Sequence, residues 1–255
     1  MNFWRKINPH SVVLEEIESS FNCKIQVIES FGERKIMAGG LIQSGGILGN
    51  IWEKGLKAIF PASPAGGNFQ LPIFNVLILG LGGGTVAQLV AKRWPQAKMM
   101  GIEIDPVMIQ LGRKYFGLDE LKNLEIIQAD AIEWVNNARC HPEAKPKDLP
   151  CIGDETDIGK KFFADTQNDN KSYKFDLILV DLYQGDKVTP GVEKEQSLKS
   201  LKRILKPGGG IIFNRLFYNH HREITEKFVK KLEKLFKITL IRAWSNLLIL
   251  AHPSS

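Results

Sequence analysis

A glycine-rich loop is the segment of this sequence best suited to hold a ligand. Gly80-Leu-Gly-Gly-Gly84 follows an apolar run and precedes a helical pattern. Glycine permits a positive φ and lets a ligand approach the backbone, and the next helix presents free N–H groups and its positive dipole end. Glu103 ends the next apolar run, 19 residues after Gly84, where a carboxylate can bind both hydroxyls of a ribose. Loop and acid together predict a nucleoside site.

The glycine spacing differs from that of dinucleotide-binding and P-loop proteins. Gly80, Gly82 and Gly84 stand closer together than in G-x-G-x-x-G, and Thr85 takes the place of the third glycine. The loop also lacks the Lys-Ser/Thr pair of a P-loop, which argues against nucleoside triphosphates. Because Asp130 closes a third apolar run, the pattern favours a ligand with one adenosine and no pyrophosphate, such as S-adenosylmethionine.

Three residues at the ends of apolar runs receive specific roles. Ile104 is expected to pack on adenine. Asp130 is expected to accept a hydrogen bond from the adenine amino group or to cap the helix over residues 131–137. Asp181 ends the fourth apolar run, and residues beyond the carboxyl ends of strands in an open α/β sheet face the ligand crevice. We therefore predict that Asp181 deprotonates or orients an attacking amine or hydroxyl.

Seven apolar runs, separated in the first half by helical patterns, predict the fold that positions these residues. Continuous apolar runs are typical of strands buried on both faces. Their alternation with helices predicts an α/β, Rossmann-like, seven-stranded and mostly parallel sheet. Only Trp244 and Ser245 separate the last two runs, which predicts an antiparallel hairpin at a sheet edge. The runs cover residues 75–80, 98–103, 124–130, 175–181, 210–214, 237–243 and 246–251.

Two segments differ from this pattern. Residues 1–67 predict a small N-terminal antiparallel β unit, one amphipathic helix and a Pro- and Gly-rich linker. Residues 68–255 form the expected main domain, with an irregular, polar insertion at about 139–174. The apolar face of the amphipathic helix consists of Trp52, Leu56, Ile59 and Phe60.

Composition excludes several classes of protein. A chain of 255 residues with 44% hydrophobic and 24% charged residues is globular rather than disordered. No apolar run approaches 18 residues, and the first ten residues lack the core of a signal peptide, so we expect no membrane span. Three cysteines suit a reducing, cytoplasmic location.

The net charge of +6 is concentrated in one region. Residues 187–237 hold 13 Lys and Arg against 5 Asp and Glu. Such a stripe either attracts nucleic acid or forms the solvated faces of helices.

With these motifs, the chain resembles the spermidine synthase-like branch of class I S-adenosylmethionine-dependent transferases over most of its length. The resemblance implies that Asp181 is catalytic, and it implies a small-molecule acceptor and a homodimer. Residues 205–210 are similar to the turn before the family's fifth strand, and the N-terminal Gln43 is similar to a glutamine that reaches the cofactor. The other cofactor-binding positions implied are Gly80, Gly82, Gly83, Gly84, Glu103, Ile104, Asp130 and Ala131.

Two departures from the family pattern bear on the reaction. True aminopropyltransferases carry Asp where this chain has Gly83, and a second Asp where it has Gln184. Ammonium groups taken from water need paired carboxylates, whereas a cofactor that keeps its α-carboxylate would be repelled by an acid at position 83. The departures favour methyl transfer from S-adenosylmethionine over aminopropyl transfer from decarboxylated S-adenosylmethionine. A non-catalytic homologue that binds the cofactor is a third interpretation.

Several other residues have weaker signals. Tyr183 and Gln184 follow Asp181 and are candidate substrate contacts. Tyr183 and Tyr218 each either line an acceptor pocket or pack. His220 and His221 are interpreted as a surface loop near the crevice, with a substrate contact by one of them as the alternative. Asp186 is interpreted as part of a turn. Cys140-His141 and Cys151 match no zinc-ligand spacing, so we predict no metal site.

Overall fold

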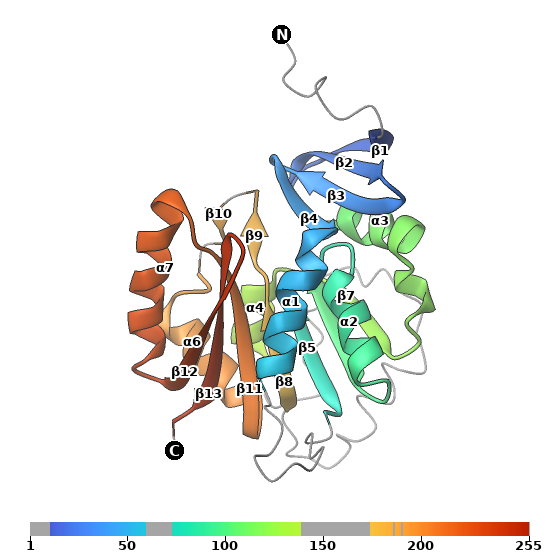
Figure 1. Ribbon diagram of the computed structural model, residues 1–255. Coiled ribbons are helices and arrows are strands. Elements are labelled where there is room, and N and C mark those ends of the chain that lie inside the picture. Colours follow the sequence, from blue (N-terminus) through green and yellow to red (C-terminus); the bar gives the residue numbers. More distant parts are fainter. Residues whose placement is uncertain (1–10, 60–72, 139–173, 186, 190, 255) are drawn as a thin grey trace.

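The computed structural model describes residues 11–59, 73–138, 174–185, 187–189 and 191–254. Its centre is a seven-stranded sheet with the order β12-β13-β11-β8-β5-β6-β7 (Figure 1). The strands are β5 (Asn75–Leu79), β6 (Lys98–Glu103), β7 (Leu124–Gln128), β8 (Phe175–Val180), β11 (Leu205–Leu216), β12 (Phe236–Ala243) and β13 (Asn246–Pro253). β13 is antiparallel to both of its neighbours, and the other pairings are parallel. The predicted α/β, Rossmann-like sheet is confirmed.

The continuous apolar strands are explained by burial on both faces of this sheet. In β5, Leu77 and Leu79 point into one hydrophobic core, whereas Val76 and Ile78 point into the other. Each of these four side chains is fully buried. Helices cover both faces (Figure 1): α1 (Ile47–Ala58) and α2 (Thr85–Arg93) on one, and α4 (Ala131–Asn137), α6 (Glu195–Ile204) and α7 (Asn219–Leu232) on the other.

The N-terminal β unit is a separate four-stranded antiparallel sheet. It consists of β1 (Ser11–Ser19), β2 (Cys23–Ser30), β3 (Glu33–Ala38) and β4 (Leu41–Gly45). Ile25, Val27 and Ile36 pack with Met108 and Leu111 of α3 (Pro106–Phe116) in a third core. This sheet lies at the top of Figure 1, above the carboxyl ends of the parallel strands.

Helix α1 packs against the main sheet rather than within the N-terminal sheet. Ile51, Trp52, Leu56 and Ile59 join the same hydrophobic core as Val76 and Ile78. Phe60, the linker at 61–67, most of the insertion at 139–174 and Asp186 lie outside the described residues.

The structure confirms the predicted two-residue hairpin turn, changes the prediction for residues 205–210, and in addition shows how α3 begins. Asp105 caps α3, because its Oδ1 accepts a hydrogen bond from the Val107 N–H at 2.9 Å. Ala243 pairs with Asn246 across the predicted two-residue turn. The turn expected at residues 205–210 lies within β11. The register between β11 and β8 shifts there: Leu205 and Gly210 are five residues apart but face Phe175 and Leu177, which are two residues apart. The extra residues of β11 therefore bulge from the strand.

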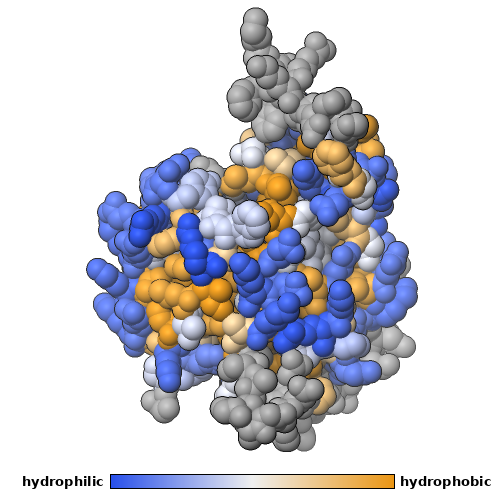
Figure 2. Space-filling view, viewed as in Figure 1, coloured by the Kyte–Doolittle hydropathy of each residue, from blue (hydrophilic) through white to orange (hydrophobic). Residues whose placement is uncertain are grey.

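In the basic region at 187–237, some lysines form ion pairs with glutamates on the same helix. Lys199 pairs with Glu195 at 2.7 Å on α6, and Lys227 pairs with Glu223 at 2.7 Å on α7. Figure 2 shows hydrophilic side chains along the outer side of α7, at the left edge of the view. These contacts favour the solvated-face interpretation, and nucleic-acid binding stays a prediction. None of the helices in the described ranges is long and apolar enough to cross a bilayer.

Candidate active site

A cleft of about 770 Å³, counting its open mouth, lies where the carboxyl ends of β5, β6 and β8 meet the N-terminal sheet. Most of the residues predicted from the sequence line it, although they come from five separate segments. They are Gln43, Gly80, Gly82, Glu103, Ile104, Asp130, Ala131, Asp181 and Tyr183.

Gly80 is required by the close contact between the ends of β5 and β8. Its φ is +82°, and a Cβ at this position would lie 2.2 Å from the carbonyl oxygen of Asp181. The Gly80 N–H donates to the carbonyl oxygen of Ile102 at 2.9 Å. A side chain at position 80 would therefore separate the loop from the strand tips that form the cleft.

Glu103 connects the tip of β6 to the glycine loop. Its Oε2 accepts a hydrogen bond from the Gly82 N–H at 2.7 Å, and its Oε1 accepts one from the Asp105 N–H at 3.0 Å. The residue is only 8% exposed and lines the cleft. Burial raises the pKa of its carboxyl group, while the backbone hydrogen bonds act in the opposite direction. Each carboxylate oxygen can accept a further hydrogen bond, so Glu103 keeps capacity for ribose hydroxyls.

Asp130 caps helix α4, which was one of its two predicted roles. Its Oδ1 accepts hydrogen bonds from the N–H groups of Ile132 and Glu133, both at 2.8 Å. The side chain also lines the cleft, and its Oδ2 accepts no hydrogen bond from the described residues. Contact between this oxygen and an adenine amino group stays a prediction.

Gly83 and Gly84 lie outside the cleft lining and serve packing instead. The Gly83 N–H donates to Ser44 Oγ at 2.7 Å, and a Cβ there would lie 2.6 Å from Ile36 Cδ1. Gly84 has a φ of +94°, and a Cβ there would lie 2.2 Å from Leu118 Cδ2. The glycine loop thus binds the N-terminal sheet on one side and Leu118 on the other, and only Gly80 and Gly82 face the cleft.

Asp181 is held at the opposite end of the cleft by two side chains. Trp52 Nε1 donates to its Oδ2 at 3.1 Å, and Asn214 Nδ2 donates to its Oδ1 at 2.9 Å. Burial raises the pKa of Asp181 to about 6, against the effect of these two hydrogen bonds. At neutral pH the carboxylate is ionised and close to the point at which it can take up a proton.

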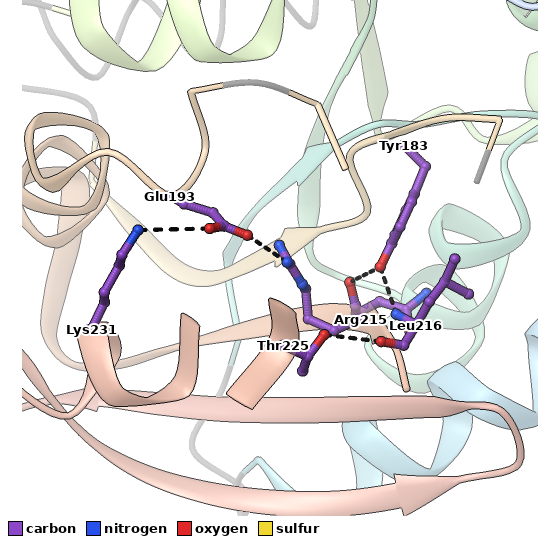
Figure 3. Close-up of polar contacts among 7 residues, drawn as sticks. Tyr183, Glu193, Arg215, Leu216, Thr225 and Lys231 are labelled. Atoms are coloured by element: carbon purple, nitrogen blue, oxygen red, sulfur yellow. Dashed lines mark hydrogen bonds and ion pairs between the residues drawn. The ribbon is translucent and has the colours of Figure 1, made fainter. Parts of the chain in front are cut away.

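Tyr183 forms a neutral wall beside Asp181. Its hydroxyl donates to the Asn214 carbonyl oxygen at 3.2 Å and accepts from the Leu216 N–H at 2.7 Å (Figure 3). Burial raises the pKa of this phenol. Beside it in Figure 3, the 3% exposed Arg215 pairs with Glu193 at 2.5 Å, so the segment after Tyr183 is tied to β11.

The N-terminal sheet forms the roof of the cleft. Asn22, Gln43 and Ser44 line it from above. Asn22 Nδ2 donates to Asp105 Oδ2 at 2.7 Å, and Gln43 Nε2 donates to the Gly185 carbonyl oxygen at 3.4 Å. The roof therefore contacts both the cofactor-side strand tip and the segment that follows Asp181.

The remaining candidates do not line the cleft. Gln184 is exposed, and its Nε2 donates to the Phe21 carbonyl oxygen at 2.7 Å. The surface loop expected at His220 and His221 is instead the first turn of α7, in which His221 is buried. Tyr218 packs edge-on against His221, whose ring lies 3.9 Å from that of His220. Cys140, His141 and Cys151 lie outside the described residues.

Sequence reasoning missed Trp52 and Asn214 as partners of Asp181, and it missed Asn22 in the roof. Trp52 shares a helical face with Leu56, a spacing that indicates burial but not the direction of the indole N–H. Asn214 ends an otherwise apolar run, and a polar residue at the carboxyl end of a central strand was the one available signal for it.

Comparison with known proteins agrees with this geometry. The family model described as "Spermine/spermidine synthase domain" matches residues 67–249. A polyamine aminopropyltransferase of Vibrio vulnificus is 25% identical over 55% of this chain and 37% of its own length. The human eEF1A lysine and N-terminal methyltransferase is 27% identical over 57% of this chain and 18% of its own length. This chain therefore spans well under half of either relative.

The fold is also found in a crystal structure of a probable spermidine synthase from Corynebacterium glutamicum. That structure superimposes with a TM-score of 0.69 at 14% identity, over 96% of this chain and 81% of that one. At this identity the match supports the fold alone. Because the family model covers most of the chain, from the glycine loop to the last strand of the sheet, this protein belongs to the spermine/spermidine synthase domain family.

Proposed function

We propose that this protein is a methyltransferase that uses S-adenosylmethionine. The observation that carries the proposal is the absence of an acid at position 83 of the glycine loop. A carboxylate at this position is what the aminopropyltransferase resemblance requires, yet a Cβ there would lie 2.6 Å from Ile36 Cδ1 and 2.9 Å from Ser44 Cβ. The loop therefore lacks the carboxylate that the aminopropyltransferase resemblance places against the amine of decarboxylated S-adenosylmethionine, and its packing against the N-terminal sheet resists one. The missing acid favours a cofactor that keeps its α-carboxylate.

The charge around Asp181, which we call the acceptor end of the cleft, supports the same reaction. Asp181 is the carboxylate of the cleft lining at that end, whereas Glu103 and Asp130 lie at the tips of β6 and β7. Gln184 replaces the second acid and turns away to the Phe21 carbonyl oxygen. A polycationic acceptor would lose its hydration without receiving paired carboxylates. The site therefore suits an acceptor with one reacting amine or hydroxyl.

The described residues fit the proposed cofactor. Gly80 and Gly82 leave the loop open to a nucleoside, and Glu103 offers carboxylate oxygens inside the cleft. Ile104, 36% exposed, offers an apolar surface beside Glu103. The bound cofactor would supply a methyl group activated by its sulfonium.

Asp181 would take a proton from the acceptor. Its carboxylate faces the cleft with both oxygens already oriented by Trp52 and Asn214. Since a sulfonium is a good leaving group, in-line positioning supplies most of the acceleration, and proton removal supplies a smaller share. Activity should rise with pH as this carboxyl group, with its pKa of about 6, becomes ionised.

Isothermal titration with both forms of the cofactor tests the proposal. We expect S-adenosylmethionine to bind at least 10-fold more tightly than decarboxylated S-adenosylmethionine, which is about 1.4 kcal/mol. Tighter binding of the decarboxylated form, together with consumption of putrescine, would establish aminopropyl transfer instead. Tight binding of S-adenosylmethionine with no methyl transfer to any amine, hydroxyl compound or nucleic acid would identify a non-catalytic homologue.

A further inference from the structure

A row of hydrogen-bonded side chains leads from the last hairpin of the sheet to Asp181. Ser245 Oγ donates to Asn246 Oδ1 at 3.0 Å, and Asn246 Nδ2 donates to Asn214 Oδ1 at 2.8 Å. Asn214 Nδ2 then donates to Asp181 Oδ1 at 2.9 Å. The row runs from the β12–β13 turn through β13 and β11 to the residue after β8.

The direction of every hydrogen bond in this row is fixed by chemistry. An ionised carboxylate only accepts, so it requires the NH₂ end of the Asn214 amide. The oxygen end of that amide then needs a donor, which Asn246 supplies. If the Asn214 amide rotated by 180°, an oxygen would face the carboxylate and an NH₂ group would face another NH₂ group. The Asp181 carboxylate and the Asn246 amide therefore favour the same orientation, in which Asn214 donates to Asp181.

Because both asparagines are buried, loss of a hydrogen bond between them would leave a polar group without a partner. Asn214 and Asn246 are each 4% exposed, and a buried polar group without a hydrogen-bond partner is destabilising. Their side chains lie on the face of β11 and β13 opposite Arg215, whose guanidinium pairs with Glu193. The ionisable groups that share the cleft with Asp181 are Glu103, Asp130 and Tyr183.

We propose that Asn214 and, through it, Asn246 are positioning residues that hold the Asp181 carboxylate in its ionised, cleft-facing orientation. The inference rests on the proposed function only in giving Asp181 the role of base. Neither asparagine is a catalytic residue. Asn214 acts on Asp181 directly, and Asn246 acts by orienting Asn214.

Carboxyl ¹³C NMR of protein labelled at aspartate measures this effect without cofactor or acceptor. The Asp181 resonance is identified by its loss in Asp181→Asn. In Asn214→Leu the titration midpoint of Asp181 should rise by about 1 pH unit, because a hydrogen bond to a charged group is lost. In Asn246→Leu, which removes no atom that touches Asp181, it should rise by about half as much. Ser245→Ala should shift it least.

Asn136→Leu is the matched control. Asn136 is also partly buried and hydrogen-bonded, to Ser197 Oγ at 3.4 Å, but it lies on α4 away from Asp181. Its substitution should leave the midpoint unchanged. An unchanged midpoint in folded Asn246→Leu would overturn the proposed role of Asn246, and an unchanged midpoint in Asn214→Leu would overturn the whole inference.

Two further measurements keep the test decisive. If the leucine variants fail to fold, Asn246→Ser retains a donor at position 246 and should give a smaller upward shift. No shift in that variant and in Ser245→Ala would count against the row. Failure of the proposed function would appear separately, as absent binding of S-adenosylmethionine in calorimetry, with the titration of Asp181 unaffected.

Discussion

The two ends of the cleft are built in different ways. At the cofactor end, Glu103 accepts a hydrogen bond from Gly82, 21 residues earlier in the chain, so the contact lies within a single strand–helix–strand unit. At the acceptor end, Asp181 receives hydrogen bonds from Trp52, 129 residues away, and from Asn214, 33 residues away. The first end is local in sequence and follows a motif, whereas the second depends on the packing of three distant elements.

The largest effect is expected from Gly84→Ala, which tests whether the cofactor end depends on packing beneath its loop. The new Cβ would lie 2.2 Å from Leu118 Cδ2 at a φ of +94°. Left-handed strain and overpacking together should lower the free energy of unfolding by about 4 kcal/mol, as measured by urea denaturation. Gly185→Ala, with φ of +61° and nothing within 4 Å of the new Cβ, should cost only about 1 kcal/mol. Equal losses in the two variants would contradict the packing role.

Glu103→Gln tests whether the end of the cleft at Glu103 binds the cofactor. In the variant, either the Gly82 N–H or the Asp105 N–H would face the new NH₂ group, and the charged acceptor for ribose hydroxyls would be lost. Affinity for S-adenosylmethionine should therefore fall on the order of 100-fold. Calorimetry measures the loss. Glu125→Gln on the adjacent strand β7 is the control, since Glu125 is also a carboxyl whose pKa is raised by burial but does not line the cleft. A similar loss in both variants would remove the special role of Glu103.

Asp181→Asn should change the pH dependence of stability. The folded-state pKa of Asp181 is raised to about 6, from an ordinary value of 3.8. Between these values the folded state binds more protons, so the free energy of unfolding falls as pH rises from about 4 to 6 and levels off above. This carboxyl group accounts for at most about 3 kcal/mol of that fall. The difference between wild type and variant in urea denaturation at pH 4, 5, 6 and 7 isolates its share, and a difference that does not vary with pH would refute the assignment.

Ser44→Ala should give the smallest effect and tests the roof. The Gly83 N–H would lose its partner at 2.7 Å in a buried position, which should cost about 1–2 kcal/mol. Ser11→Ala in β1 of the same sheet removes a hydrogen bond between two partly buried hydroxyls and should cost about 0.5 kcal/mol. Thermal unfolding compares them. If Ser11→Ala costs as much, the Ser44 contact has no special weight.

The sequence predicted what depends on local pattern. Continuous apolar runs located the strands because both faces of the sheet are buried, and Trp244-Ser245 located the hairpin because two residues leave no other connection. Glu103 and Asp181 were found because strand ends meet at one edge of a parallel sheet.

What the sequence did not predict depends on tertiary contacts. Gly83 and Gly84 looked like ligand-binding glycines, yet Ile36 and Leu118 occupy the space that their side chains would need. Apolar spacing placed Trp52 in the core without showing that its N–H reaches Asp181. The register of β11 against β13, which brings Asn214 beside Asn246, cannot be read from either strand alone.

The distances along the chain also bear on how the molecule folds. Contacts that close short loops form early, and contacts that close long ones are delayed by chain entropy. The Gly82–Glu103 hydrogen bond can thus form before the β12–β13 hairpin pairs with β11. The hydrogen-bonded row that ends at Asp181 is complete only when that hairpin has joined the sheet. A refolding protein should gain affinity for its nucleoside before it gains turnover.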